Sequence, residues 1–542
     1  MIQFNKTDEK LKNIAALMEK KVKANADLTL VIDRTMDEFD AEIKNGVIRA
    51  GDYGQLLDAC GRYLRNPKIE GEFHSYKDVC GIYFAAHDDN YLDMAPVDEI
   101  CDYLDDLALW GMNHFKIWLD LAFHEDIKEE KCQNKIKRHK AMLRRASELG
   151  IKTSLVAIGN EAFYNSPEHL RADWTCGHDG YIYDLNDHYH VEICPSKEGG
   201  MEKIIEYRRQ MLEEFKDAPP DYISFGAYDE GGCTCSKCAP WGSNGYVRCL
   251  ETLIPVVREY MPNVKFIASL WQFGTFTGDD REYIGFKKVM EEGRLSEIDY
   301  LSSEPQYARY PFEHGMPRPI LNFPEISMFG AYPWGGFGTN PLPKLMEGLW
   351  KNNGHKVAGG YAYSEGMYED LNKVIILRQY RDNQSSEDTI REYLNYEFGL
   401  TGEVLENTVQ AVMAMEETLP RSNPYATEIP HSYIIEKPEK IPFIEKAIIE
   451  ADKTLSDEVR NTKKWKLIYL RAVIDGELLR NNFVRNEKTL AYFHELTQMG
   501  YLETALRCLR PDIDEFKLSR RLTAEEDHKI AMGGDIEKLG LC

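Results

Sequence analysis

The sequence predicts an α/β protein built on a (β/α)8 TIM barrel, with a small N-terminal α/β domain and a C-terminal α-helical domain. Eight short apolar segments recur between residues 80 and 362, and stretches with helical spacing of apolar residues separate them. Beyond about residue 383 only helical patterns remain. A chain of 542 residues has room for a barrel of roughly 250–300 residues and two smaller domains. We therefore expect domains at 1–72, 73–385 and 386–542.

The N-terminal segment has the pattern of a small α/β unit. A charged helix is expected over 7–24, followed by a β-branched apolar strand over 28–32. After Gly51, the residues Leu56, Leu57, Cys60 and Leu64 recur at helical spacing and predict a second helix.

The central segment alternates strands and helices. The expected strands are 81–85, 114–119, 152–157, 222–227, 264–270, 299–302, 319–322 and 357–362. The expected helices between them include 97–110, 135–149, 201–215, 245–260 and 281–292. An open doubly wound sheet is the competing architecture, but no Gly-rich phosphate turn follows the first strand. Eight units in series favour the closed barrel.

The C-terminal segment predicts a helical bundle, with helices at 387–397, 402–419, 441–453, 457–482 and 488–498. We expect this bundle to pack against the barrel and to be the surface through which a homo-oligomer would form.

Composition excludes several classes of partner. The formal net charge of −24 disfavours nucleic acid and anionic membrane surfaces, which need clustered Lys and Arg. No window is apolar enough to span a membrane, and the N-terminus lacks the apolar core of a secretory signal. Twelve scattered cysteines suit a reducing compartment. These features predict a cytoplasmic protein.

Polar residues at the expected strand ends indicate where chemistry takes place, because active sites of this fold lie at the C-terminal ends of the strands. Asp or Glu follows most of the eight expected strands, and Asp229-Glu230 follows the fourth. Carboxylates beside aromatic faces are what glycoside hydrolysis needs, and Glu230 is the expected proton donor, with Asp229 beside it. Candidate substrate-binding residues are His87, Asp120, Glu161, Tyr228, Trp271, Trp334, Tyr363 and Glu365.

The segment from Phe225 to Glu230 resembles the strand-four signature H-x-G-G-D-E of the β-N-acetylhexosaminidases, glycoside hydrolase family 20. Its His and two Gly positions hold Phe225, Ala227 and Tyr228 here. The resemblance extends over about residues 40–385, and the N-terminal segment 49–57 looks like the loop and helix that precede the barrel in this family and in the α-glucuronidases, family 67. It implies a glycosidase acting on small oligosaccharides or glycosides, in which Glu230 is the general acid and Asp229 orients an acetamido group.

The α-glucuronidases supply a second template, an inverting enzyme with an acid on strand four and base carboxylates on strands six and seven. Glu304 and Glu325 occupy those strand positions. Three mechanisms stay open: substrate-assisted retention with Asp229, double displacement with Glu325 as nucleophile, and inversion with Glu304 or Glu325 as base. No cofactor is expected for any of them.

Two other classes of function compete with a glycosidase. One is a carbohydrate-binding barrel without catalysis, which the changed signature residues favour. The other is a metal-dependent hydrolase of the amidohydrolase type, which requires an H-x-H pair on the first strand, and this pair is absent.

A cysteine cluster follows the proposed acid directly. Cys233, Cys235 and Cys238 have the spacing C-x-C-x-x-C and would hold a structural zinc ion if a fourth ligand joined them. Cys194 is the first candidate for that ligand, and Cys176 and His178 are the others. Reduced thiols that pack a tight loop are the alternative.

Overall fold

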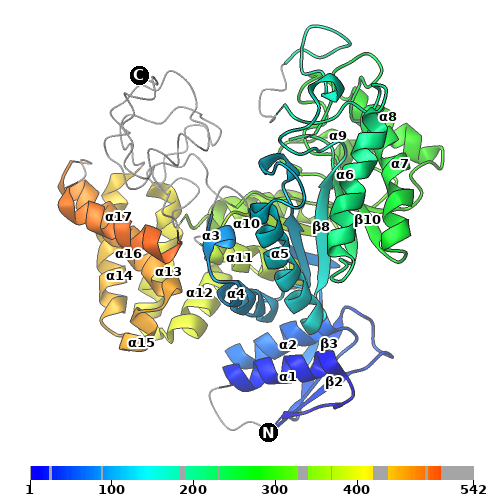
Figure 1. The fold of residues 1–542 in the computed structure, drawn as a ribbon. Helices are drawn as coiled ribbons and strands as arrows, with labels where there is room; N and C mark the ends of the chain where they lie inside the picture. Colours follow the sequence, from blue (N-terminus) through cyan, green and yellow to red (C-terminus); the bar gives the residue numbers. More distant parts are fainter. Residues whose placement is uncertain are drawn as a thin grey trace.

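The computed structural model describes residues 2–22, 27–86, 90–183, 190–229, 231–326, 340–367, 369–418, 437–482 and 486–501. Its centre is an eight-stranded parallel sheet with the order β12-β11-β10-β9-β8-β7-β6-β13 (Figure 1). The strands are β6 Val79–Phe84, β7 His114–Trp118, β8 Lys152–Ile158, β9 Tyr222–Gly226, β10 Lys265–Ser269, β11 Ile298–Ser302, β12 Ile320–Leu321 and β13 Gly359–Ser364. All eight predicted strands are therefore present.

The two edge strands of this sheet meet and close the barrel. Parallel bridges join Asn322 to Gly360 and Glu325 to Tyr363, and the Tyr361 amide donates to the Asn322 carbonyl at 3.0 Å. Gly360 allows the close contact at this junction, since a Cβ there would lie 2.3 Å from the Asn322 carbonyl oxygen. A closed parallel barrel confirms the predicted fold class.

One or more helices follow each barrel strand, as the alternating pattern predicts. They are α3 Tyr91–Met94, α4 Val97–Leu109, α5 Glu130–Leu149, α6 Gly200–Phe215, α7 Gly245–Tyr260, α8 Arg281–Glu291, α9 Tyr310–His314, α10 Pro343–Asn353 and α11 Asp370–Asp382. β6, β7 and β9 are buried along their whole length, because helices cover one face and the barrel interior fills the other. This burial explains why the strands appear in the sequence as continuous apolar runs.

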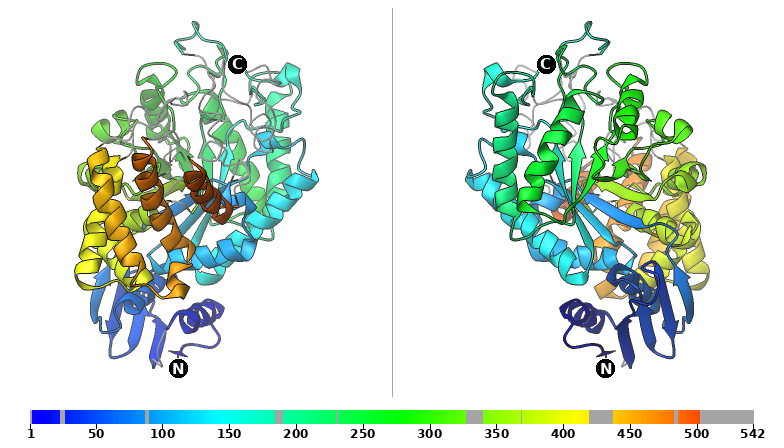
Figure 2. Two further views of the ribbon diagram at one scale, coloured as in Figure 1. Left: turned by 90° about the vertical axis from the view of Figure 1, so that its left-hand side faces the viewer. Right: turned by 90° about the vertical axis from the view of Figure 1, so that its right-hand side faces the viewer.

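The N-terminal unit is a five-stranded sheet with two helices (Figure 2). Its strands are β1 Ile2–Gln3, β2 Leu28–Ile32, β3 Asp40–Lys44, β4 Val47–Ala50 and β5 Gly71–His74, and its helices are α1 Glu9–Lys21 and α2 Tyr53–Arg65. Buried ion pairs attach α2 to α11, among them Arg378 with Asp58 at 3.1 Å. The strand over 28–32 and both helices agree with the sequence, whereas β1, β3, β4 and β5 were not predicted.

The C-terminal helices form a separate bundle beside α11 (Figure 1). They are α12 Ser386–Phe398, α13 Gly402–Met415, α14 Ile441–Asp452, α15 Asp457–Arg460, α16 Lys463–Arg480 and α17 Glu487–Met499. The single helix predicted over 457–482 is wrong, because it breaks before Thr462, whose side chain caps the start of α16 by accepting from the Trp465 amide. A buried Arg471–Asp475 pair also reaches Asn340, 3.0 Å from Arg471, and so ties the bundle to the barrel.

Candidate active site

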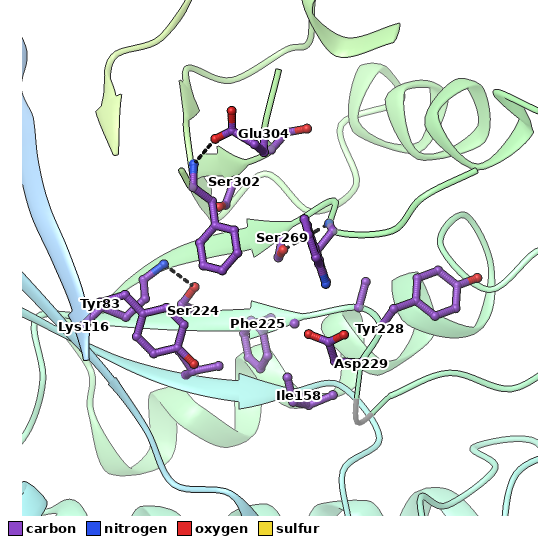
Figure 3. A pocket seen from close by; sticks show the side chains of 16 residues that line it. Tyr83, Lys116, Ile158, Ser224, Phe225, Tyr228, Asp229, Ser269, Ser302 and Glu304 are labelled. Carbon is purple, nitrogen blue, oxygen red and sulfur yellow. Dashed lines mark hydrogen bonds between the residues drawn. The ribbon is translucent and has the colours of Figure 1, made fainter. Parts of the chain in front are cut away.

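A pocket opens at the C-terminal ends of the barrel strands (Figure 3). Seven consecutive strands or the segments directly after them supply its wall, from β6 to β12. The lining residues are Tyr83, Lys116, Val156, Ile158, Ser224, Phe225, Gly226, Ala227, Tyr228, Asp229, Ser269, Trp271, Ser302, Ser303, Glu304 and Phe323. The pocket therefore lies at the end of the barrel where the strand-end residues predicted it.

Aromatic rings form one side of this pocket. The Phe323 ring lies 6.0 Å from Tyr83 and 5.5 Å from Trp271, centroid to centroid, and Tyr363 packs 5.3 Å from Tyr83. Trp271 also meets Tyr307 at 5.5 Å. The indole Nε1 of Trp271 is buried and has no hydrogen-bond partner among the described residues.

Asp229 presents a carboxylate to the pocket from the end of β9. Its side chain is exposed, and its carboxylate turns toward the middle of the pocket (Figure 3). The Gln272 amide nitrogen donates to Asp229 Oδ1 at 3.0 Å, which ties the end of β9 to the end of β10. Both residues have left-handed backbones, with φ of 69° and 60°. Strained backbone held by a hydrogen bond is common where a fold positions functional side chains.

The segment after residue 230 is fixed by a second clamp. Asn160, fully buried beyond the end of β8, donates to the carbonyls of Ile193 and Gly232, each at 2.9 Å. Its Oδ1 accepts from the Gly232 amide at 2.8 Å. The chain is therefore held at Asp229 by Gln272 and at Gly232 by Asn160.

Lys116 contributes a basic group to the pocket that the sequence analysis did not identify. It lies on β7, donates to Ser224 Oγ at 3.2 Å and packs 4.0 Å from the centre of the Tyr361 ring. No carboxylate among the described residues pairs with it, and burial lowers the pKa of Lys116 to about 7. The signal in the sequence that indicates Lys116 is a charged residue inside an otherwise apolar strand.

Glu304 lies at the edge of the pocket and is 3% exposed. Its Oε2 accepts from the Phe323 amide at 2.9 Å, and the carboxyl group turns away from Asp229 (Figure 3). It also borders a second cavity lined by Tyr380 and Trp350. Burial raises the pKa of Glu304 to about 8, and the charge of Glu325 acts in the same direction.

Glu325 and Glu365 both lie close to Tyr363, and Glu365 accepts from its hydroxyl. Glu325 is half-buried at the barrel closure and accepts from the Tyr307 hydroxyl at 3.1 Å, while the Tyr363 hydroxyl donates to Glu365 at 3.2 Å. Burial raises the pKa of Tyr363, and the negative charges of Glu365, Glu325 and Asp229 add to the effect. The carboxylates of three predicted site residues are thus close enough to Tyr363 to raise its pKa.

Three other predicted side chains are occupied by structural partners. Asp120 is buried and pairs with Lys135 at 2.7 Å. Glu161 is buried, accepts from Trp118 Nε1 at 3.1 Å and lies 3.8 Å from Arg208. Tyr228 borders the pocket, but its hydroxyl donates away from it to Glu282. Neither Asp120 nor Glu161 is among the residues that line the pocket.

Glu282 was missed because it lies inside α8, where an acidic residue normally indicates a solvated face. It is fully buried and accepts from Tyr228 at 2.6 Å, from the Gly242 amide at 2.7 Å and from the Gly274 amide at 2.8 Å. It therefore joins the loops that follow β9 and β10.

Three predicted residues, Glu230, His87 and Trp334, lie outside the described residues.

The four cysteines of the predicted cluster come together next to this site. The sulfur atoms of Cys194, Cys233, Cys235 and Cys238 all lie within 4.8 Å of one another. Cys176 is exposed and His178 binds Thr175 and Asp179, so Cys194 is the fourth member of the cluster. The long loop after β8 and the loop after β9 meet at this point.

No family model and no curated protein matches the chain. Among solved structures, a family 89 glycoside hydrolase from Clostridium perfringens in complex with GlcNAc-alpha-1,4-galactose has a TM-score of 0.57 at 12% identity, covering 92% of this chain. This chain spans 65% of the length of that structure.

Two further structures cover more of both chains. A family 115 4-O-methyl-alpha-glucuronidase has a TM-score of 0.57 at 9% identity, over 96% of this chain and 79% of that chain. A family 138 enzyme targeting pectin rhamnogalacturonan II has a TM-score of 0.56 at 11% identity, over 99% and 76%. The chain therefore has the fold of these glycoside hydrolases, which confirms the predicted resemblance at the level of fold. No helix of the described part is long and apolar enough to cross a bilayer.

Proposed function

We propose that the chain is a glycoside hydrolase that removes a terminal sugar from small oligosaccharides or glycosides, with Glu230 as the general acid and Asp229 assisting. The observation that carries the proposal is the position of Asp229, whose carboxylate enters an aromatic-walled pocket at the C-terminal mouth of the barrel. Glu230 is the next residue in the chain, and the fold likeness to several glycoside hydrolases supports the same reading.

Glu325 is the better candidate for the second catalytic carboxylate. The raised pKa of Glu304, about 8, keeps that group protonated at neutral pH, and a protonated carboxyl cannot accept a proton from water or attack the anomeric carbon. Its carboxyl also turns toward the Phe323 amide. Glu325 does not itself line the pocket, but it is half-buried next to it and accepts from the Tyr307 hydroxyl. Its negative charge raises the pKa of Tyr363, as the charge of Asp229 does.

A uronide-specific glycosidase is a second candidate, favoured by Lys116. A buried, pocket-lining ammonium without a carboxylate partner among the described residues is suited to an anionic group of the substrate. The family 115 structure of similar fold is an alpha-glucuronidase. The first candidate, which is hexosaminidase-like, depends instead on Asp229, which would orient an acetamido group.

The test is hydrolysis of a panel of aryl glycosides that contains N-acetylhexosaminides and uronides. Glu230→Gln should lower turnover of the best substrate by orders of magnitude and leave substrate binding in place. The matched control is Glu458→Gln, which changes an exposed carboxyl on α15. Unchanged turnover in Glu230→Gln would refute the assignment of the acid. Sugar binding without hydrolysis by the wild type would favour a carbohydrate-binding barrel.

A further inference from the structure

The spacing of the four clustered sulfur atoms matches a tetrahedral metal site. Cys194 Sγ lies 3.8 Å from Cys235 Sγ and 3.9 Å from Cys238 Sγ. Zinc–sulfur bonds of about 2.3 Å in tetrahedral geometry place neighbouring sulfur atoms about 3.8 Å apart. A disulfide would bring two of them to about 2.05 Å. The larger core of an iron–sulfur cluster needs thiolates that stand farther apart.

Hydrogen-bond donors point at two of the sulfur atoms. The Asp173 amide donates to Cys233 Sγ at 3.4 Å. The Ser196 hydroxyl lies 3.0 Å from Cys238 Sγ, and the same oxygen accepts from Arg248 at 2.6 Å. Because Arg248 donates to that oxygen, the Ser196 proton is available to the sulfur. Such donors stabilise the negative charge of metal-bound thiolates. Four neutral thiols carry no charge for them to stabilise.

We propose that Cys194, Cys233, Cys235 and Cys238 bind one Zn²⁺ in a closed structural site that joins the loop after β8 to the loop after β9. With four protein ligands a tetrahedral zinc ion has no open position for water or substrate, so its role is structural. Binding deprotonates the four thiols and leaves a tetrathiolate centre of net charge −2. The proposal does not depend on the glycosidase activity.

The cluster lies close to Asp229 in the chain, so a bound metal ion would also affect the position of Asp229. Cys233 follows Asp229 by four residues, and the Thr234 amide donates to the Asp173 carbonyl at 2.9 Å. The ion would thus fix the far end of the segment that Asn160 and Gln272 hold nearer the pocket. It would position Asp229 without touching substrate.

The experiment is the metal content of the wild-type chain, purified without a metal-affinity tag. Native mass spectrometry should find one zinc ion per chain, and zinc-edge absorption should show four sulfur neighbours at about 2.3 Å. Replacing zinc with Co²⁺ should give the intense visible bands of tetrahedral tetrathiolate cobalt. These measurements need no variant, so they test the proposal even if a cysteine variant does not fold.

Variants identify the ligands. Cys194→Ser and Cys233→Ser should each lower zinc content at least tenfold after dialysis against a chelator, whereas Cys176→Ser, an exposed cysteine in the same loop, should retain one ion. A wild-type chain without metal, whose four clustered thiols all react with a thiol reagent when the chain is native, would overturn the proposal. Bound iron in place of zinc would overturn it too, as would full zinc content in both ligand variants.

Discussion

The wild-type protein should lose free energy of unfolding as the pH rises toward 8, and replacing Glu304 with Gln should abolish the part of this loss that Glu304 causes. Burial raises the pKa of Glu304 from 4.5 to about 8 in the folded state. The unfolded chain releases this proton above about pH 4.5, and the folded chain keeps it until about pH 8. Between these values the folded state binds more protons, so the free energy of unfolding falls as the pH rises. Gln cannot lose a proton and removes this contribution.

The two pKa values set the magnitude. They differ by about 3.5, and each tenfold change in proton affinity corresponds to about 1.4 kcal/mol, so the upper limit is about 5 kcal/mol. Gln is nearly isosteric and keeps an oxygen for the Phe323 amide. The variant should therefore match the wild type near pH 5 and exceed its free energy of unfolding by about 3–5 kcal/mol near pH 8. Glu161 and Glu192, whose pKa values burial raises to about 7 and about 8, contribute equally to both proteins.

The assay is urea and thermal unfolding at intervals from pH 5 to pH 9, followed by tryptophan fluorescence and circular dichroism. Glu458→Gln serves as the control, because the same chemical change at an exposed position should shift the wild-type curve little at any pH. Parallel pH profiles for wild type and Glu304→Gln would show that Glu304 is ionised in the folded state. That result would also restore Glu304 as a candidate base.

Two shorter predictions concern the clamp and the aromatic wall. Asn160→Ala removes three buried hydrogen bonds and should lower the free energy of unfolding by about 3 kcal/mol, which chemical denaturation measures. It should also reduce kcat, measured by steady-state kinetics, because Gly232 is held less tightly. A variant with unchanged stability and kcat would contradict the clamp. Trp271→Ala removes an aromatic ring from the pocket wall and should raise KM about tenfold, which substrate titration measures. A change in kcat alone would place Trp271 outside the binding surface.

The fold could be predicted because its main elements carry their signal locally. Strands covered on both faces are continuous apolar runs, and the helices between them keep one apolar face, so period and length identify both. Four strands of the N-terminal sheet were not predicted. β1 and β4 are only two and four residues long, and in β3 and β5 polar residues alternate with few apolar ones. The break before α16 escaped because Thr462 follows an unbroken helical pattern, and only its capping hydrogen bond shows where the new helix begins.

The site was predicted in part because a strand end fixes where a residue lies and leaves the direction of its side chain open. Asp229 and Trp271 reach the pocket. Glu161 and Asp120 occupy equivalent positions, yet their carboxylates turn to Arg208 on α6 and Lys135 on α5, partners that no local pattern reveals. Direction is decided by packing between distant segments.

Lys116 decides how the pocket responds to the charge of a substrate. Burial raises the pKa of Glu304 to about 8 and lowers that of Lys116 to about 7, so in the substrate-free pocket Glu304 is neutral at pH 7 and Lys116 only partly charged. A carboxylate placed beside Lys116 would stabilise the ammonium form and raise its pKa, so a uronide would take up protons from buffer as it binds near neutral pH. A neutral sugar has no such effect on Lys116. The proton count on binding, measured by calorimetry in buffers of different ionisation enthalpy, therefore separates the two substrate classes even before any turnover is observed.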